Sequence, residues 1–102
     1  MQFSREINEI LGMSEIVVFS KPNCRYCDEL KTYLHDHGVD GFALVDTNAM
    51  PSDISENFIE TVVANTDLKS FPICFMHRQY ISADDLKKKL VLSFKENDID
   101  TI

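Results

Sequence analysis

The sequence has no tryptophan and contains only three residues each of glycine, proline and cysteine among its 102 residues. No Pro- or Gly-rich linker, internal repeat or low-complexity run divides it. A chain of this length supports one hydrophobic core but not two. We therefore expect a single domain spanning residues 1–102, with an acidic and frayed tail over residues 96–102.

Long apolar runs and an excess of basic residues are also missing. No apolar run approaches the ~18 residues of a membrane-spanning helix, and charges near the first residue argue against a secretory signal. Ten Lys and Arg against seventeen Asp and Glu leave a formal net charge of −7. This balance argues against nucleic acids or acidic membranes as partners. We expect a monomeric cytoplasmic protein.

The three cysteines form one close pair, Cys24 and Cys27, and one distant residue, Cys74. Small secreted domains usually carry even sets of cysteines that form a structural framework. A bridge between Cys24 and Cys27 would close so short a loop that the chain-entropy model gives it only roughly 2 kcal/mol. The pair is therefore better explained as a reversible redox couple in a reducing compartment.

Apolar spacing predicts alternating helices and strands along the chain. Helices are expected over residues 3–11, 24–37, 54–63 and from 82 onward, and strands over 16–19, 42–45, 71–75 and 79–81. The first two strands should be parallel because a helix joins them, and the last two should form an antiparallel hairpin. The order α-β-α-β-α-β-β-α predicts an α/β fold with a mixed four-stranded sheet and helices on both faces. This layout resembles the thioredoxin fold.

The motif Cys-x-x-Cys lies between the first predicted strand and the following helix. This context places Cys24 at a helix N-terminus, where free backbone N–H groups and the macrodipole favour a thiolate. Cys27 lies one turn further on, within reach to resolve a mixed disulfide. It shares a helical face with Leu30 and Leu34, so we expect it to be more buried and less reactive than Cys24.

Charged residues surround the two cysteines. Lys21 and Arg25 would favour the thiolate, whereas Asp28 and Glu29 would oppose it. Arg25 is equally well explained as a solvent-exposed side chain. The sequence alone does not decide between these two roles for Arg25.

The run Lys-Pro-Asn-Cys-Arg-Tyr-Cys at residues 21–27, with Ser-Phe-Pro at residues 70–72, resembles the dithiol glutaredoxins over roughly residues 14–92. The resemblance implies a glutathione-disulfide oxidoreductase with Cys24 as nucleophile and Cys27 as resolver. Glutathione would be the electron donor, and no metal is expected. The implied substrates are disulfide-containing or glutathionylated proteins, with ribonucleotide reductase as a candidate at the level of the family.

The same resemblance implies a glutathione site. Its expected residues are Lys21, Tyr26, Phe71, Pro72 and Asp84. Lys21 would attract the glycine carboxylate, Phe71 would bind the cysteinyl part through its backbone, and Pro72 would follow a cis peptide bond. Asp84, with Ser82 and Ala83, would receive the γ-glutamyl end. Pro72 could instead be an ordinary proline at a strand entry.

The sequence departs from the glutaredoxin pattern before its last helix. The usual Gly-Gly pair is missing, and Ser82 with Asp85 fits a helix-capping pair equally well. The preceding hairpin at residues 76–79 also lacks the expected turn glycine. We expect weaker glutathione binding or a shifted pose.

Three other functions remain as alternatives. A thioredoxin-like reductase fed by a flavoprotein is disfavoured because no tryptophan precedes Cys24. A zinc module using Cys24, Cys27, Cys74 and His77 is disfavoured by the long separation of the two halves and because Cys74 and His77 would lie on opposite faces of a strand. A glutathione-ligated iron–sulfur cluster bridging two subunits stays open, and we interpret Cys74 as a small core residue.

Overall fold

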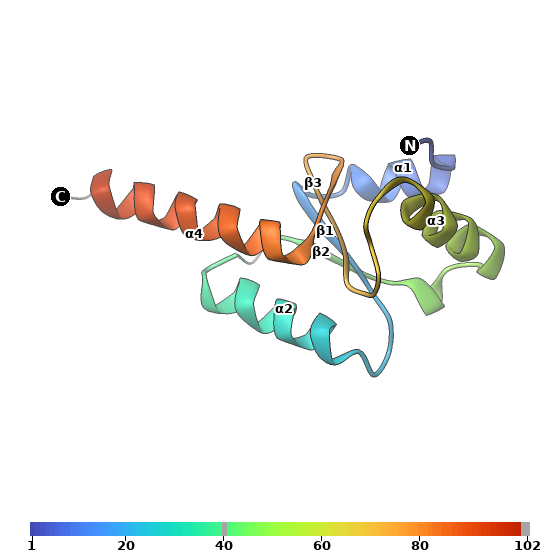
Figure 1. Ribbon diagram of the computed structural model, residues 1–102, viewed down its shortest axis with the longest axis horizontal. Coiled ribbons are helices and arrows are strands. Elements are labelled where there is room, and N and C mark those ends of the chain that lie inside the picture. Colours follow the sequence, from blue (N-terminus) through green and yellow to red (C-terminus); the bar gives the residue numbers. More distant parts are fainter. Residues whose placement is uncertain (40, 101–102) are drawn as a thin grey trace.

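The structure is a computed structural model that describes residues 1–39 and 41–100, with side chains through residue 91. Its elements are α1 (Arg5–Leu11), β1 (Ile16–Ser20), α2 (Arg25–Asp36), β2 (Ala43–Asp46), the 3₁₀ helix η1 (Thr47–Ala49), α3 (Ser52–Asn65), β3 (Ile73–Met76), β4 (Gln79–Ile81) and α4 (Ala83–Asp100). The predicted order of helices and strands is confirmed (Figure 1). No helix among the described residues is both long and apolar enough to cross a membrane.

The four strands form one mixed sheet in the order β2-β1-β3-β4. β1 pairs with β2 in parallel, with Val18 opposite Leu44, and with β3 in antiparallel, with Val18 opposite Cys74. β3 and β4 form the predicted antiparallel hairpin. The thioredoxin-like sheet topology expected from the sequence is confirmed.

Alternating residues of β1 point to the two faces of the sheet, and each face is covered by a pair of helices (Figure 1). The phenylalanine-rich cluster lies under α1 and α3 and consists of Ile7, Leu11, Val17, Phe19, Phe58, Val62, Ile73 and Phe75. The aliphatic cluster lies under α2 and α4 and consists of Ile16, Val18, Leu30, Leu34, Cys74 and Leu86. β1 is buried between them, so the loop that follows it starts from a firmly held strand.

Some predicted bounds were wrong. β3 begins at Ile73 rather than residue 71, because Pro72 has no N–H to donate to a neighbouring strand. In α3, Val63 is 50% exposed, whereas Phe58 and Val62 are buried, so the apolar residues of this predicted helix do not all face inward. Helix η1 was not predicted.

The end of the chain also differs from the expected frayed tail. α4 continues to Asp100, so residues 96–100 are helical where we expected fraying. Residues 101 and 102 of the predicted tail lie outside the described residues. We expected the Phe94 side chain to point inward, but it is not among the side chains that the structure describes.

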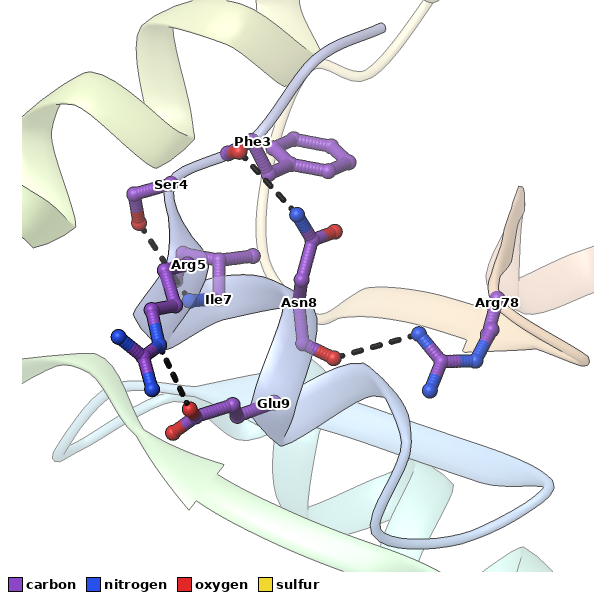
Figure 2. Close-up of polar contacts among 7 residues, drawn as sticks. All are labelled: Phe3, Ser4, Arg5, Ile7, Asn8, Glu9 and Arg78. Carbon is purple, nitrogen blue, oxygen red and sulfur yellow. Dashed lines mark hydrogen bonds and ion pairs between the residues drawn. The ribbon is translucent and has the colours of Figure 1, made fainter.

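The turn between β3 and β4 has no glycine, yet both of its central residues adopt left-handed backbone angles. His77 has φ 51° and Arg78 has φ 66°, as a two-residue hairpin turn requires. Tertiary contacts hold this turn: the N–H of His77 donates to the carbonyl of Glu15 at 2.8 Å. The guanidinium of Arg78 donates to the carbonyl of Asn8 in α1 at 3.3 Å (Figure 2). These contacts offset the usual cost of left-handed non-glycine residues, about 1–2 kcal/mol each.

Candidate active site

Cys24 lies at the N-cap of α2, directly after the loop that leaves β1. Its backbone is extended, with φ −104° and ψ 108°, and its Sγ accepts a hydrogen bond from the N–H of Cys27 at 3.2 Å. The position matches the one expected from the strand–motif–helix pattern. At this position the free N–H groups of the first turn and the positive end of the helix dipole both favour a negative charge on sulfur.

Cys24 and Cys27 are joined by a disulfide in the structure, with their Cα atoms 5.2 Å apart. Cys24 is 7% exposed and Cys27 is 2% exposed. Cys24 is thus the more accessible of the two, in the expected order, although both are largely covered.

Asn23, directly before Cys24, has a left-handed backbone with φ 58°. Asparagine tolerates this conformation better than other residues with a side chain. We did not predict this conformation from the sequence. Proline followed by asparagine fits the two central positions of a type II turn, whose second central residue is left-handed, and this pattern could have revealed it.

Thr47 was also missed, and it is the one buried polar residue among the described side chains. Its Oγ1 donates a hydrogen bond to the carbonyl of Ser20 at 3.1 Å. Ser20 ends β1, so this bond holds the point from which the active-site loop departs. The contact joins the carboxyl ends of two parallel strands, an edge where α/β folds gather functional residues.

Arg25 does not direct its charge at the thiol pair. Its Nε lies 3.2 Å from Oε1 of Glu29, and both side chains are exposed to solvent. The structure therefore favours the solvent-exposed alternative for Arg25. Lys21 lies differently: its Nζ is 5.3 Å from the centroid of the Phe71 ring.

An open groove of about 520 Å³ is lined in part by Tyr26, the residue between Cys24 and Cys27 in the motif. Among the residues lining it are Tyr26, Phe71, Pro72 and Asp84, together with Ser82, Ala83, Lys69 and Lys87. The peptide bond between Phe71 and Pro72 is cis, as the resemblance implied. The structure therefore brings together four of the five residues predicted to bind glutathione, and the fifth, Lys21, contacts the ring of Phe71.

The N-terminus of α4 forms one end of this groove. The hydroxyl of Ser82 accepts a hydrogen bond from the N–H of Asp85 at 3.1 Å, so Ser82 caps the helix. Asp84 is exposed and lines the groove. The capping alternative for Ser82 is confirmed, and it is compatible with Asp84 facing a ligand.

Cys74 lies in the middle of β3, within the aliphatic cluster. Burial raises the pKa of its thiol to about 12, and the nearby charge of Lys87 lowers it by less. His77, its partner in the zinc alternative, is exposed on the hairpin turn. Within residues 1–39 and 41–100, no three His, Cys, Asp or Glu side chains come together as metal ligands.

Comparison with known proteins agrees with this geometry. The model of the Glutaredoxin family matches residues 16–81. No curated protein matches the sequence.

Several solved structures share the fold. The dithiolic glutaredoxin of Trypanosoma brucei brucei is 20% identical, with 99% of this chain and 97% of that chain covered and a TM-score of 0.67. Glutaredoxin C1 of Populus tremula x tremuloides, in its holo form, is 20% identical, with 93% and 88% covered and a TM-score of 0.65. A glutaredoxin of Archaeoglobus fulgidus is 20% identical, with 78% and 89% covered and a TM-score of 0.58. At this identity the likeness concerns the fold alone.

Proposed function

The chain belongs to the glutaredoxin family, and we propose that it is a glutathione-dependent thiol–disulfide oxidoreductase. The family and the Cys-x-x-Cys motif imply thiol oxidoreductase activity. The choice of glutathione as reductant is the proposal. The observation that carries it is the position of Cys24 at the N-cap of α2, where Tyr26 of the first helical turn lines a groove together with Phe71 and Pro72.

In the first half of the reaction, the Cys24 thiolate attacks one sulfur of a substrate disulfide. The substrate S–S bond breaks as the new S–S bond to Cys24 forms, and the released thiolate takes a proton from water. The helix N-terminus favours the attacking thiolate because its N–H groups bind negative charge. With a glutathionylated protein as substrate, glutathione remains on Cys24 and the protein thiol leaves.

In the second half, the mixed disulfide on Cys24 is resolved by one of two thiolates. Cys27 can attack Sγ of Cys24, which releases the bound thiol and forms the internal disulfide seen in the structure. Alternatively, a second glutathione attacks the glutathione sulfur and restores the Cys24 thiolate. After the Cys27 route, two free glutathione molecules reduce the internal disulfide and leave as one glutathione disulfide. In the direct route, the glutathionyl group from the substrate and one free glutathione leave as glutathione disulfide. Each substrate disulfide reduced therefore yields one glutathione disulfide, and the electrons balance.

The groove supports glutathione as the ligand. Lys21 forms no ion pair among the described residues, so its ammonium is available to a carboxylate. Asp84 lines the groove and can pair with the amine of the γ-glutamyl group. Tyr26 is an exposed aromatic residue between the two cysteines and offers its ring to the ligand.

The same proposal covers the substrates, the oligomeric state and the cellular location of the protein. The substrates would be protein disulfides and glutathionylated proteins, with ribonucleotide reductase as one candidate, and the protein would act as a monomer in the cytoplasm. The formal charge of −7 should disfavour strongly acidic partners.

The test is a coupled assay of purified protein with the mixed disulfide of glutathione and cysteine. Glutathione and glutathione reductase are present in one series, and a thioredoxin reductase replaces them in a parallel series. We expect turnover in the first series only. Turnover only with thioredoxin reductase would contradict the proposal and favour the flavoprotein-fed alternative.

A further inference from the structure

Lys21 is held by an aromatic ring instead of by an acidic side chain. Its Nζ lies 5.3 Å from the centroid of Phe71, within the range of a cation–π contact. Among the described residues the side-chain ion pairs join Arg5 with Glu9 and Arg25 with Glu29. The positive charge of Lys21 is therefore oriented but not neutralised.

The ring of Phe71 is itself anchored. It is half-buried and packs against the phenylalanine-rich cluster under α1 and α3, and it also lines the groove that Tyr26 borders. A free lysine samples many rotamers, and holding it in one position costs conformational entropy. Because the core fixes the ring, the ring restricts the rotamers of Lys21 already in the free protein. Less conformational entropy is then lost when a ligand binds.

We infer that the side chain of Phe71 is a positioning residue for Lys21. Its ring holds the ammonium group at the groove, where that group can meet a carboxylate of a glutathionyl substrate. This role of the side chain is separate from the hydrogen bonds that the backbone of Phe71 would offer to the same ligand. The inference rests on the proposed function, because it assigns the anionic ligand of that site.

The chain offers variants that separate this role from simple packing. Phe71→Leu keeps an apolar side chain against the core but removes the ring, and Phe71→Tyr keeps the ring. Lys21→Ala removes the charge that the ring holds. Lys69→Ala is the matched charge control, because Lys69 also lines the groove, while the cation–π contacts among the described residues involve Lys21 and Lys87.

The experiment measures KM and kcat for the mixed disulfide of glutathione and cysteine. Phe71→Leu should raise KM about two- to five-fold, since an exposed cation–π contact contributes about 0.5–1 kcal/mol and 1.4 kcal/mol corresponds to tenfold. kcat at saturation should change little. Phe71→Tyr should keep the wild-type KM.

A double-mutant cycle tests whether ring and charge act together. In the Lys21→Ala background, Phe71→Leu should raise KM no further, because the group that the ring holds is gone. In the Lys69→Ala background, Phe71→Leu should have its full effect. Equal effects of Phe71→Leu in the wild-type and Lys21→Ala backgrounds would overturn the inference.

A measurement without ligand keeps the two proposals distinguishable. Ring currents should shift the NMR signals of the Lys21 Hε protons upfield in the free wild-type protein and in Phe71→Tyr, but not in Phe71→Leu. Absence of that shift in the wild type would overturn the inference whatever the activity. Absence of turnover by the wild type, with the shift present, would instead overturn the proposed function, and with it the ligand assigned to Lys21.

Discussion

Cys24 and Cys74 have the same side chain and are both largely covered, but their surroundings differ. Cys24 is the N-cap residue of α2, after the loop that leaves β1. Its sulfur accepts a hydrogen bond from the N–H of Cys27. Cys74 lies inside β3, between Val18 of β1 and Ile81 of β4, within an aliphatic cluster. Burial raises the pKa of Cys74 to about 12.

The comparison shows that burial alone does not decide the chemistry of a thiol. Both sulfurs lose water, which disfavours the thiolate. At Cys24 the first turn of α2 provides donors in place of that water, whereas around Cys74 the neighbours are apolar side chains. We therefore expect Cys24 to be reactive and Cys74 to be inert within one small domain.

The largest expected effect comes from removing the reactive sulfur. Cys24→Ser should reduce turnover of a glutathionyl mixed disulfide to background, because a serine hydroxyl at this position is a far weaker nucleophile than a thiolate. Cys27→Ser should retain deglutathionylation, since glutathione itself can resolve the adduct. The coupled glutathione reductase assay measures both.

Cys74→Val serves as the matched control, because it removes the third thiol from the core. It should leave this activity close to that of the wild type. Equal losses in Cys24→Ser and Cys27→Ser would contradict the division of roles between the two cysteines.

Alkylation of the reduced native protein should separate the two environments directly. Iodoacetamide should label Cys24 first and Cys27 more slowly, while Cys74 should stay unlabelled until the protein opens. Mass spectrometry of peptides over a time course gives the rate at each cysteine. Labelling of native Cys74 as fast as Cys24 would break the comparison.

Alkaline pH should destabilise the protein through Cys74. The folded state keeps this thiol protonated up to a pKa of about 12, whereas the ordinary value is 9.0. Above pH 9 the unfolded state loses the proton first, so the free energy of unfolding falls by up to about 1.4 kcal/mol per pH unit until about pH 12. Urea unfolding at pH 8 and pH 10 measures the fall.

Cys74→Val removes this titration, so its unfolding free energy should fall less between the two pH values. Comparing the change with pH, and not the absolute stability, cancels the effect of the substitution on packing. An identical fall in both proteins would show that other groups cause it.

The smallest expected effect concerns the start of the active-site loop. Thr47→Val removes the donor to the carbonyl of Ser20 and should cost about 1 kcal/mol of unfolding free energy. It should also change the alkylation rate of Cys24 while leaving Cys74 protected, because only the former lies on the loop that this bond holds. Thr47→Ser keeps a hydroxyl and should retain most of the stability. If the Thr47→Val protein had wild-type stability and wild-type labelling rates, this hydrogen bond would not stabilise the start of the active-site loop.

Much of the fold and part of the site followed from local patterns. The continuous apolar run over residues 16–19 predicted β1, and the Cys-x-x-Cys spacing between strand and helix predicted the N-cap position of Cys24. The observed element boundaries differ from the predicted ones where a single residue changes the hydrogen bonding, as Pro72 does at the start of β3. The two left-handed residues of the β3–β4 turn could not be predicted, because the hairpin has no glycine and is held by α1 and Glu15.

The sequence by itself determined the order of the elements, the place of the redox pair and the resemblance to the glutaredoxins, because these depend on residues close together in the chain. Only the tertiary structure decided which charges and donors serve the site. Thr47 meets Ser20 and Lys21 meets Phe71 because the sheet brings together residues far apart in sequence. Arg25 instead forms an ion pair with Glu29, one turn further along the same helix. Such choices depend on distances between side chains, and folding alone sets those distances.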